Sequence, residues 1–255
     1  MSNSNLVVYT RISPNRTSPR NHAIDRITIH CAVGQVTAER LGEIFAPKSR
    51  GASSNYGVDK DGRIGMYCEE KDRSWCSSTR ENDNRAITIE VASDNFHPYR
   101  VTDKAYNALI ELCVDICQRN GKKKLLWFGD KTKTLNYVPK SDEMVMTVHR
   151  WFANKSCPGD YLYNLHGDIA NRVTEKLGSA QPDTEQVPED DTVPFKVKVI
   201  IDDLNIREEP NMSAKVVGVT GKGVFTIVET QNGWGRLKSG AGWIYIDNPR
   251  YVTKL

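Results

Sequence analysis

The chain has 255 residues, of which 38% are hydrophobic and 26% are charged, with 18 Gly and 11 Pro. This globular composition excludes a disordered chain, a collagen and a coiled coil. Apolar runs such as residues 125–128 are far shorter than the roughly 20 residues that cross a bilayer, so we expect no membrane partner. The formal net charge is only +3 and the basic residues are scattered, which argues against nucleic acid as a partner.

The first 20 residues contain one short apolar run, Leu6 to Tyr9, and lack the apolar core of a secretory signal. We therefore expect synthesis in the cytoplasm without Sec-dependent export. Six cysteines in such a chain are typical of free thiols or metal ligands rather than of a disulfide framework.

Strands and helices alternate in the first part of the sequence. Residues 24–30 read as a strand, with Ile27 and Ile29 on one face and His30 at its end. A helix capped by Thr37 follows, then a hairpin over residues 58–67 and a strand over residues 86–91.

Two longer helices complete this part. Residues 102–120 carry an apolar stripe that includes Cys113 and Cys117, which we expect in the core, and Gly121 sits at the C-cap. A second helix follows Pro158 and ends at Gly178. The pattern predicts an α/β fold with a mixed central sheet flanked by helices.

Residues 179–194 are rich in Pro and acidic residues, which is typical of a solvated linker. Short β-rich segments separated by Gly or Asn turns follow, and about sixty residues of this kind predict a small all-β barrel. The sequence therefore predicts a catalytic domain over residues 1–178, a linker over 179–194 and a second domain over 195–255.

The segment HRWFANKSCPG contains His149, Lys155 and Cys157. An imidazole and a thiolate placed around a tight Pro-Gly turn can bind one metal ion together with a ligand from elsewhere, for which His30 is the natural candidate. Two His and one Cys leave one position of a tetrahedral ion open, as in catalytic sites. Spacing alone leaves the alternative open that these are polar histidines and a buried thiol.

The segments ITIHCAVG, SSNYGVDKDGRIG, AITIEVAS and VHRWFANKSCPGDY, in this order, resemble the zinc-dependent N-acetylmuramoyl-L-alanine amidases of type 2. This family includes phage lysins and peptidoglycan recognition proteins, and the likeness covers about residues 20–178. It implies one Zn²⁺ per chain, held by His30, His149 and Cys157. A recognition protein that has lost its Cys ligand is disfavoured, because all three ligands are present.

The same resemblance implies that Glu90, in ITIEV, is the general base and that Lys155 stabilises the oxyanion. Strand periodicity agrees with a role for Glu90, since it shares a face with Thr88 and a neighbouring strand could bring His30 beside it. An ordinary surface Glu and a solvated loop Lys are the alternatives.

The sequence departs from the family pattern at SSNYG, where relatives often have a His before the Tyr or a catalytic Tyr two places earlier. These positions are Asn55 and Ser54, so we assign no catalytic hydroxyl to Tyr56. Trp75 is expected to be a core residue. No role is predicted for the remaining histidines, His22, His97 and His166.

Residues from Lys196 onward resemble the bacterial SH3-like domain, with the marks Leu204–Arg207, Pro210, Gly233-Trp234 and Gly242-Trp243. This resemblance implies a module that binds cell wall. We expect Leu204 and Ile206 to fill the core. Trp234, Trp243 and Tyr245 are candidates for an aromatic rim that binds the ligand, and the sequence leaves open which of them is exposed.

The expected function is zinc-dependent hydrolysis of the amide bond between N-acetylmuramic acid and L-alanine. The expected context is a monomeric phage or prophage endolysin, released by a holin, with peptidoglycan as its partner. A bacterial autolysin exported by another route is the second possibility. Two alternatives remain open: a non-catalytic peptidoglycan-binding protein, and a wall peptidase with Cys31 or Cys157 as nucleophile.

Overall fold

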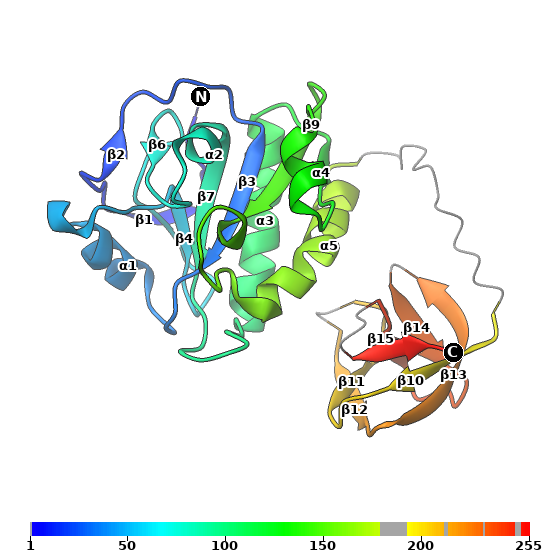
Figure 1. Ribbon diagram of the computed structural model, residues 1–255. Coiled ribbons are helices and arrows are strands. Elements are labelled where there is room, and N and C mark those ends of the chain that lie inside the picture. Colours follow the sequence, from blue (N-terminus) through cyan, green and yellow to red (C-terminus); the bar gives the residue numbers. More distant parts are fainter. Residues whose placement is uncertain (1, 179–192, 212–213, 232, 248–250) are drawn as a thin grey trace. The chain divides into compact units, whose positions relative to one another are not determined.

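The computed structural model describes residues 2–178, 193–211, 214–231, 233–247 and 251–255 (Figure 1). The chain divides into two compact units, residues 1–182 and 183–255. Most of the expected linker, residues 179–192, lies outside the described residues. Among the described helices, none is long and apolar enough to cross a membrane.

A seven-stranded mixed sheet forms the centre of the first unit, in the order β1-β5-β4-β7-β3-β9-β8. Only β4 and β5 are antiparallel neighbours, and they form the hairpin predicted from the sequence. The strand bounds are Val7–Thr10 (β1), Arg26–Cys31 (β3), Tyr56–Val58 (β4), Ile64–Met66 (β5), Ala86–Val91 (β7), Lys124–Leu126 (β8) and Glu143–Val148 (β9). A separate short pair joins Arg16–Thr17 (β2) to Arg73–Ser74 (β6).

Helices flank this sheet, which confirms the predicted α/β architecture. α3 and α5 pack against each other, with α3 against β4 and α5 against β3, β8 and β9, while α1 contacts β1, β4 and β5 (Figure 1). The α-helices are Ala38–Phe45 (α1), Arg80–Arg85 (α2), Asp103–Arg119 (α3), Lys131–Asn136 (α4) and Gly159–Lys176 (α5), and the 3₁₀ turns are Lys48–Arg50 (η1) and His149–Trp151 (η2).

Local sequence signals fix several of these boundaries. The side chain of Thr37 accepts a hydrogen bond from the first turn of α1, so the predicted N-cap is present, and Thr102 caps α3 in the same way at the predicted start of that helix. Gly121 adopts a positive φ directly after α3, as a C-terminal glycine does. Cys113 and Cys117 are fully buried, which confirms that they are core residues.

The centre of the sheet is buried on both faces, so polar residues lie inside it. Every residue of β3 is buried, although its sequence alternates apolar and polar residues. On its polar face the hydroxyls of Thr28 and Thr147 hydrogen-bond at 2.7 Å, and Asn82 donates to Thr28. Polar groups on this face therefore satisfy one another, as buried polar groups must.

The second unit is a seven-stranded antiparallel sheet in the order β12-β11-β15-β14-β13-β10-β16. Leu204 and Ile206 belong to its apolar core, as expected. The strand bounds are Phe195–Val199 (β10), Leu204–Arg207 (β11), Val216–Thr220 (β12), Gly223–Gln231 (β13), Trp234–Leu237 (β14), Trp243–Tyr245 (β15) and Val252–Lys254 (β16).

Two of the three aromatic candidates for a ligand-binding rim are buried in this unit. Trp234 is 1% exposed and Trp243 is 8% exposed. Tyr245 is half-buried and packs against Trp234 with ring centroids 5.4 Å apart. A sheet of about sixty residues has few large apolar side chains, so its tryptophans are used to fill its interior.

Candidate metal centre and groove

Three neighbouring strands place the predicted site residues along one edge of the sheet. His30 in β3 is in register with Glu90 in β7. On the other side of β3, Ile29 pairs with Val148, so His149 follows directly beside His30. Because these strands are parallel, their carboxyl ends meet at the same edge.

Cys157 joins this group from the loop before α5. The backbone amide of Arg150 donates to the Cys157 carbonyl at 3.1 Å and closes this loop. The Cys157 Sγ lies 3.3 Å from the Nδ1 of His30, and the rings of His30 and His149 have centroids 5.1 Å apart. One donor atom from each of the three residues lies within 4.8 Å of the other two.

This donor set fits a zinc ion. Two imidazoles and one thiolate are ligands that Zn²⁺ prefers, and three protein ligands leave one position open. The Nε2 of His30 is buried without a hydrogen-bond partner in the described part of the chain. Burial and the neighbouring His149 hold the pKa of His30 well below its ordinary value, so the ring is neutral, as a metal ligand must be.

Glu90 lies beside this donor set with a carboxyl suited to proton transfer. Burial raises the pKa of Glu90 to about 7. Its Oε2 is buried without a hydrogen-bond partner among the described residues, and its Oε1 accepts from the Cys76 thiol at 3.8 Å. A carboxyl that titrates near neutral pH can both accept and return a proton.

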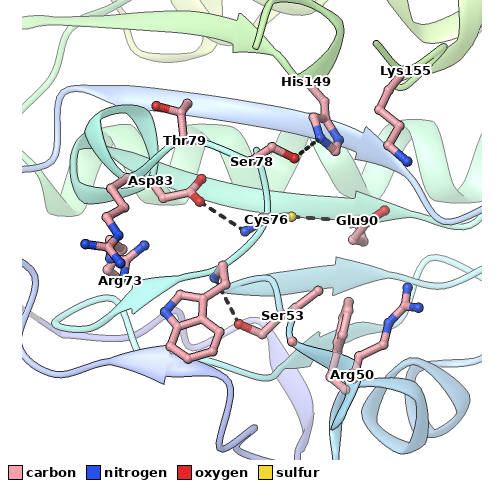
Figure 2. A pocket seen from close by; sticks show the side chains of 15 residues that line it. Arg50, Ser53, Arg73, Cys76, Ser78, Thr79, Asp83, Glu90, His149 and Lys155 are labelled. Carbon is pink, nitrogen blue, oxygen red and sulfur yellow. Dashed lines mark hydrogen bonds between the residues drawn. The ribbon is translucent and has the colours of Figure 1, made fainter. Parts of the chain in front are cut away.

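A cavity of about 530 Å³ opens beside these residues, and Glu90, His149 and Lys155 line it (Figure 2). We call this cavity the groove. Lys155 is exposed, and the pKa of His149 is lowered by burial and by the positive charge of Lys155. Lys155 therefore acts electrostatically on the same space as the candidate metal ligands.

Trp75 lies on the wall of the groove, so the expectation of a core tryptophan is wrong. It is 36% exposed, and its indole nitrogen donates to the Thr17 hydroxyl at 3.0 Å. The reason is its position directly after β6, which pairs only with β2 and is not part of the main sheet.

The loop Cys76–Ser78 contributes two contacts that the sequence did not indicate. The Ser78 hydroxyl lies 2.8 Å from the Nε2 of His149, and the Cys76 thiol contacts Glu90 (Figure 2). Asp83 anchors this loop, accepting from the backbone amides of Cys76 and Ser77, each at 3.1 Å. The loop has no periodic pattern or family motif, so no signal in the sequence points to it.

The residues without a predicted role lie outside the groove. Tyr56 is fully buried and its hydroxyl donates to Glu70 at 2.7 Å. His22 and His97 are exposed, whereas His166 is buried with its Nδ1 bonded to the Leu162 carbonyl. None of these four residues is available to the groove.

Comparison with known proteins identifies a family. The family model described as N-acetylmuramoyl-L-alanine amidase matches residues 20–160, which is more than half of the chain. The family assignment rests on this match. The comparison with curated proteins finds no match.

Several solved structures are similar to parts of the chain. The endolysin LysCS from Clostridium intestinale URNW, an N-acetylmuramoyl-L-alanine amidase, has 20% identity and a TM-score of 0.46, covering 65% of this chain and 93% of its own. The Ph2119 endolysin from the Thermus scotoductus MAT2119 bacteriophage has 15% identity and a TM-score of 0.40, covering 60% and 89%. A mutant endolysin from Bacillus subtilis has 14% identity and a TM-score of 0.41, covering 65% and 97%.

Proposed function

The chain belongs to the N-acetylmuramoyl-L-alanine amidase family, and on this premise we propose that it is a zinc-dependent hydrolase of peptidoglycan. The bond cleaved is the amide between the lactyl group of N-acetylmuramic acid and L-alanine. One observation carries the proposal: the donor atoms of His30, His149 and Cys157 converge. Beside them, His149 and Glu90 line an open groove.

In this proposal His30, His149 and Cys157 hold the metal. When bound, zinc supplies a Lewis acid that polarises the amide carbonyl and makes water more acidic. The neutral state of His30 favours binding. The thiol of Cys157 has a pKa raised by its hydrogen bond with Cys31 and by burial, so a cation is needed to favour its thiolate form.

Glu90 acts as the general base. Its carboxylate takes a proton from the attacking water and returns it to the departing amine of L-alanine. The thiol of Cys76 orients one carboxylate oxygen, which leaves Oε2 without a protein partner among the described residues. Lys155 offsets the negative charge that develops on the amide oxygen.

The second unit is proposed to be an SH3-like module that binds cell wall, and the whole chain to act as an endolysin. The proposed linker, residues 179–194, would keep the enzyme at high effective concentration on an insoluble polymer. Because Trp234 and Trp243 are buried, Tyr245 is the aromatic residue left from the predicted set for contact with the wall.

A cysteine peptidase is the competing enzyme class. The 3.3 Å contact between Cys157 and His30 suits such a pair, but burial and Cys31 disfavour the thiolate that a nucleophile requires. The second imidazole, that of His149, also has no role in the mechanism of a cysteine peptidase. A non-catalytic binding protein would have no use for the buried carboxyl of Glu90.

Mass spectrometry of digested Gram-positive sacculi tests the function. The protein is assayed as purified, after chelation and after zinc is added back. Free lactyl carboxylates and stem peptides with a new L-alanine amine, lost on chelation and restored by zinc, are expected. Cleavage inside the stem that survives chelation would instead show a cysteine peptidase, and binding without cleavage a recognition protein.

Glu90→Gln tests the general base. We expect turnover to fall by about 10²- to 10⁴-fold, because the amide cannot accept a proton. Zinc content, measured by elemental analysis, should stay at one ion per chain, since Glu90 is not a proposed ligand. Near-normal turnover in the zinc-loaded variant would refute this role.

A further inference from the structure

A second group of metal-binding side chains adjoins the proposed zinc ligands. His30, Cys76 and Glu90 each offer one donor atom within 4.8 Å of the other two, and we call them the outer donor set. His30 also belongs to the inner donor set, which it forms with His149 and Cys157. Imidazole, thiolate and carboxylate are all ligands that Zn²⁺ accepts, so the outer donor set has the chemistry of a zinc site of its own.

The outer donor set contains buried polar atoms that lack a partner. The Nε2 of His30 and the Oε2 of Glu90 are both buried without a hydrogen-bond partner in the described part of the chain. The other carboxylate oxygen of Glu90, Oε1, accepts from the Cys76 thiol at 3.8 Å (Figure 2). Buried polar atoms without partners cost free energy, and a cation bound among these side chains would remove that cost.

Two members of the outer donor set are open to the groove, whereas the residue shared by the two sets is not. Cys76 and Glu90 line the groove (Figure 2). His30 is 1% exposed and is not among the residues that line it. An ion that enters from the groove therefore meets Cys76 and Glu90 before it reaches His30.

Glu90 is the carboxylate that can attract a cation from this groove. The other carboxylate on its wall, that of Asp83, already accepts hydrogen bonds from the loop Cys76–Ser78. His149 lines the groove as well, but the positive charge of Lys155 acts on it and opposes the approach of a cation there. The first contact of an entering ion is therefore with the outer donor set.

We propose that the outer donor set is an entry position for the metal, through which Zn²⁺ passes from the groove to the inner donor set. Because His30 belongs to both sets, the two positions adjoin, and an ion can exchange its other ligands one at a time without returning to water. Transfer to the inner donor set frees Glu90 for the proton transfer proposed for it. The inference rests on the proposed function, because it says how the proposed zinc site is filled.

Rates of metal exchange test the entry position. Zn²⁺ is mixed rapidly with the metal-free full chain, uptake is followed with a chromogenic zinc indicator, and release is followed with an excess of chelator. Cys76→Ser should slow both uptake and release by about 10-fold, the lower end of what removal of a supporting contact costs at a metal site. The equilibrium affinity should change little, because Cys76 is not an inner ligand. Cys76→His keeps a ligand at this position and should restore part of the rate.

Thr79→Ala is the matched control for this experiment. Thr79 lines the same groove, offers none of the donor atoms of either set, and its side chain makes no capping hydrogen bond to α2. Its substitution should leave uptake and release of zinc unchanged. Equal rates in Cys76→Ser and the unaltered chain, or slower uptake with unchanged release, would overturn the entry position.

Cadmium can reveal the outer position directly once the inner one is damaged. Cd²⁺ is a soft cation that favours thiolates, and a thiolate bound to it gives an ultraviolet charge-transfer band. Cys157→Ser removes the inner thiolate, so the band that remains should come from Cys76. The band should disappear in Cys157→Ser/Cys76→Ser and persist in Cys157→Ser/Cys31→Ser. No band in Cys157→Ser, or a band that depends on Cys31, would contradict the outer position.

Cleavage of peptidoglycan separates this inference from the proposed function, since both experiments measure metal binding and need no substrate. Slower zinc exchange in Cys76→Ser, in a chain that digests no sacculus, would refute the amidase and keep the entry position. Zinc-dependent cleavage with unchanged exchange in Cys76→Ser would refute only the entry position. A chain that binds no zinc would refute both.

Discussion

The hydroxyl of Ser78 is placed to orient His149, one of the proposed metal ligands. Its backbone has a φ of 64°, a conformation that residues other than Gly and Asn rarely adopt. This conformation places the hydroxyl 2.8 Å from the Nε2 of His149, which leaves Nδ1 as the ring atom free to bind a metal. Partners of this kind fix the tautomer and the direction of a ligating histidine.

Ser78→Gly should therefore weaken zinc binding by about 10- to 100-fold, because it removes the hydroxyl but keeps the positive φ. The affinity is measured by competition with a chromogenic chelator. Thermal unfolding of the metal-free variant serves as the control and should be close to that of the unaltered protein. An unchanged affinity for zinc would show that the contact does not support the ligand.

His166 makes the stability of the first unit depend on pH. Burial lowers its pKa to about 4 in the folded protein, against about 6.5 in an unfolded chain. Between these values the unfolded chain binds more protons, so the free energy of unfolding falls as the pH is lowered from 6.5 to 4. The full loss amounts to about 3 kcal/mol and is absent above pH 6.5.

His166→Gln tests this dependence, because glutamine does not titrate. Urea unfolding of the unaltered chain and the variant is compared at pH 7 and at pH 4.5. The variant should be less stable at pH 7, and this difference should shrink at pH 4.5. A difference that is constant over this range would mean that His166 is not the titrating group.

At the scale of elements, the close contact between α1 and β4 closes the face of the sheet next to the site. Gly57 in β4 is in register with Glu90 and so points to the same face. A Cβ at this position would lie 2.6 Å from Leu41 in α1 and 2.8 Å from Tyr67. Only a glycine allows α1 to pack this closely against the strand.

Gly57→Ala should destabilise the first unit by about 1–3 kcal/mol, since the added methyl group overpacks a buried contact. Gly167→Ala in α5 is the matched control, because its nearest neighbour would lie 4.0 Å away and alanine favours a helix. Chemical denaturation measures both. Equal stabilities of the two variants would contradict the packing argument.

At the scale of the whole molecule, the three proposed metal ligands all lie in the first of two compact units. A ligand that binds only the folded state stabilises the unit that binds it, by an amount that grows with its concentration. We therefore expect calorimetry to show two unfolding transitions, one for each unit. Chelation should lower the midpoint temperature of the first unit's transition only. Adding zinc back should restore this midpoint temperature. If chelation shifted both transitions, the two units would unfold together.

The sequence by itself determined the local structure and the types of side chain that are available at the site. Thr37, Thr102 and Gly121 mark helix ends through hydrogen bonds and dihedral preferences that involve only their neighbours in the chain. The strand pattern also placed Glu90 on a face where a neighbouring strand could bring His30 beside it, because side chains alternate along a strand, and the register of β3 with β7 confirms this neighbourhood.

Only the tertiary structure decided which distant segments meet. It places Ser78 against His149, Arg73 on the groove wall beside an exposed Trp75, and Trp234 and Trp243 inside the second unit. These outcomes depend on strand order, on loops anchored by buried groups such as Asp83, and on competition among side chains for a small core. Such effects join residues far apart in the chain, so periodicity and short motifs do not carry them.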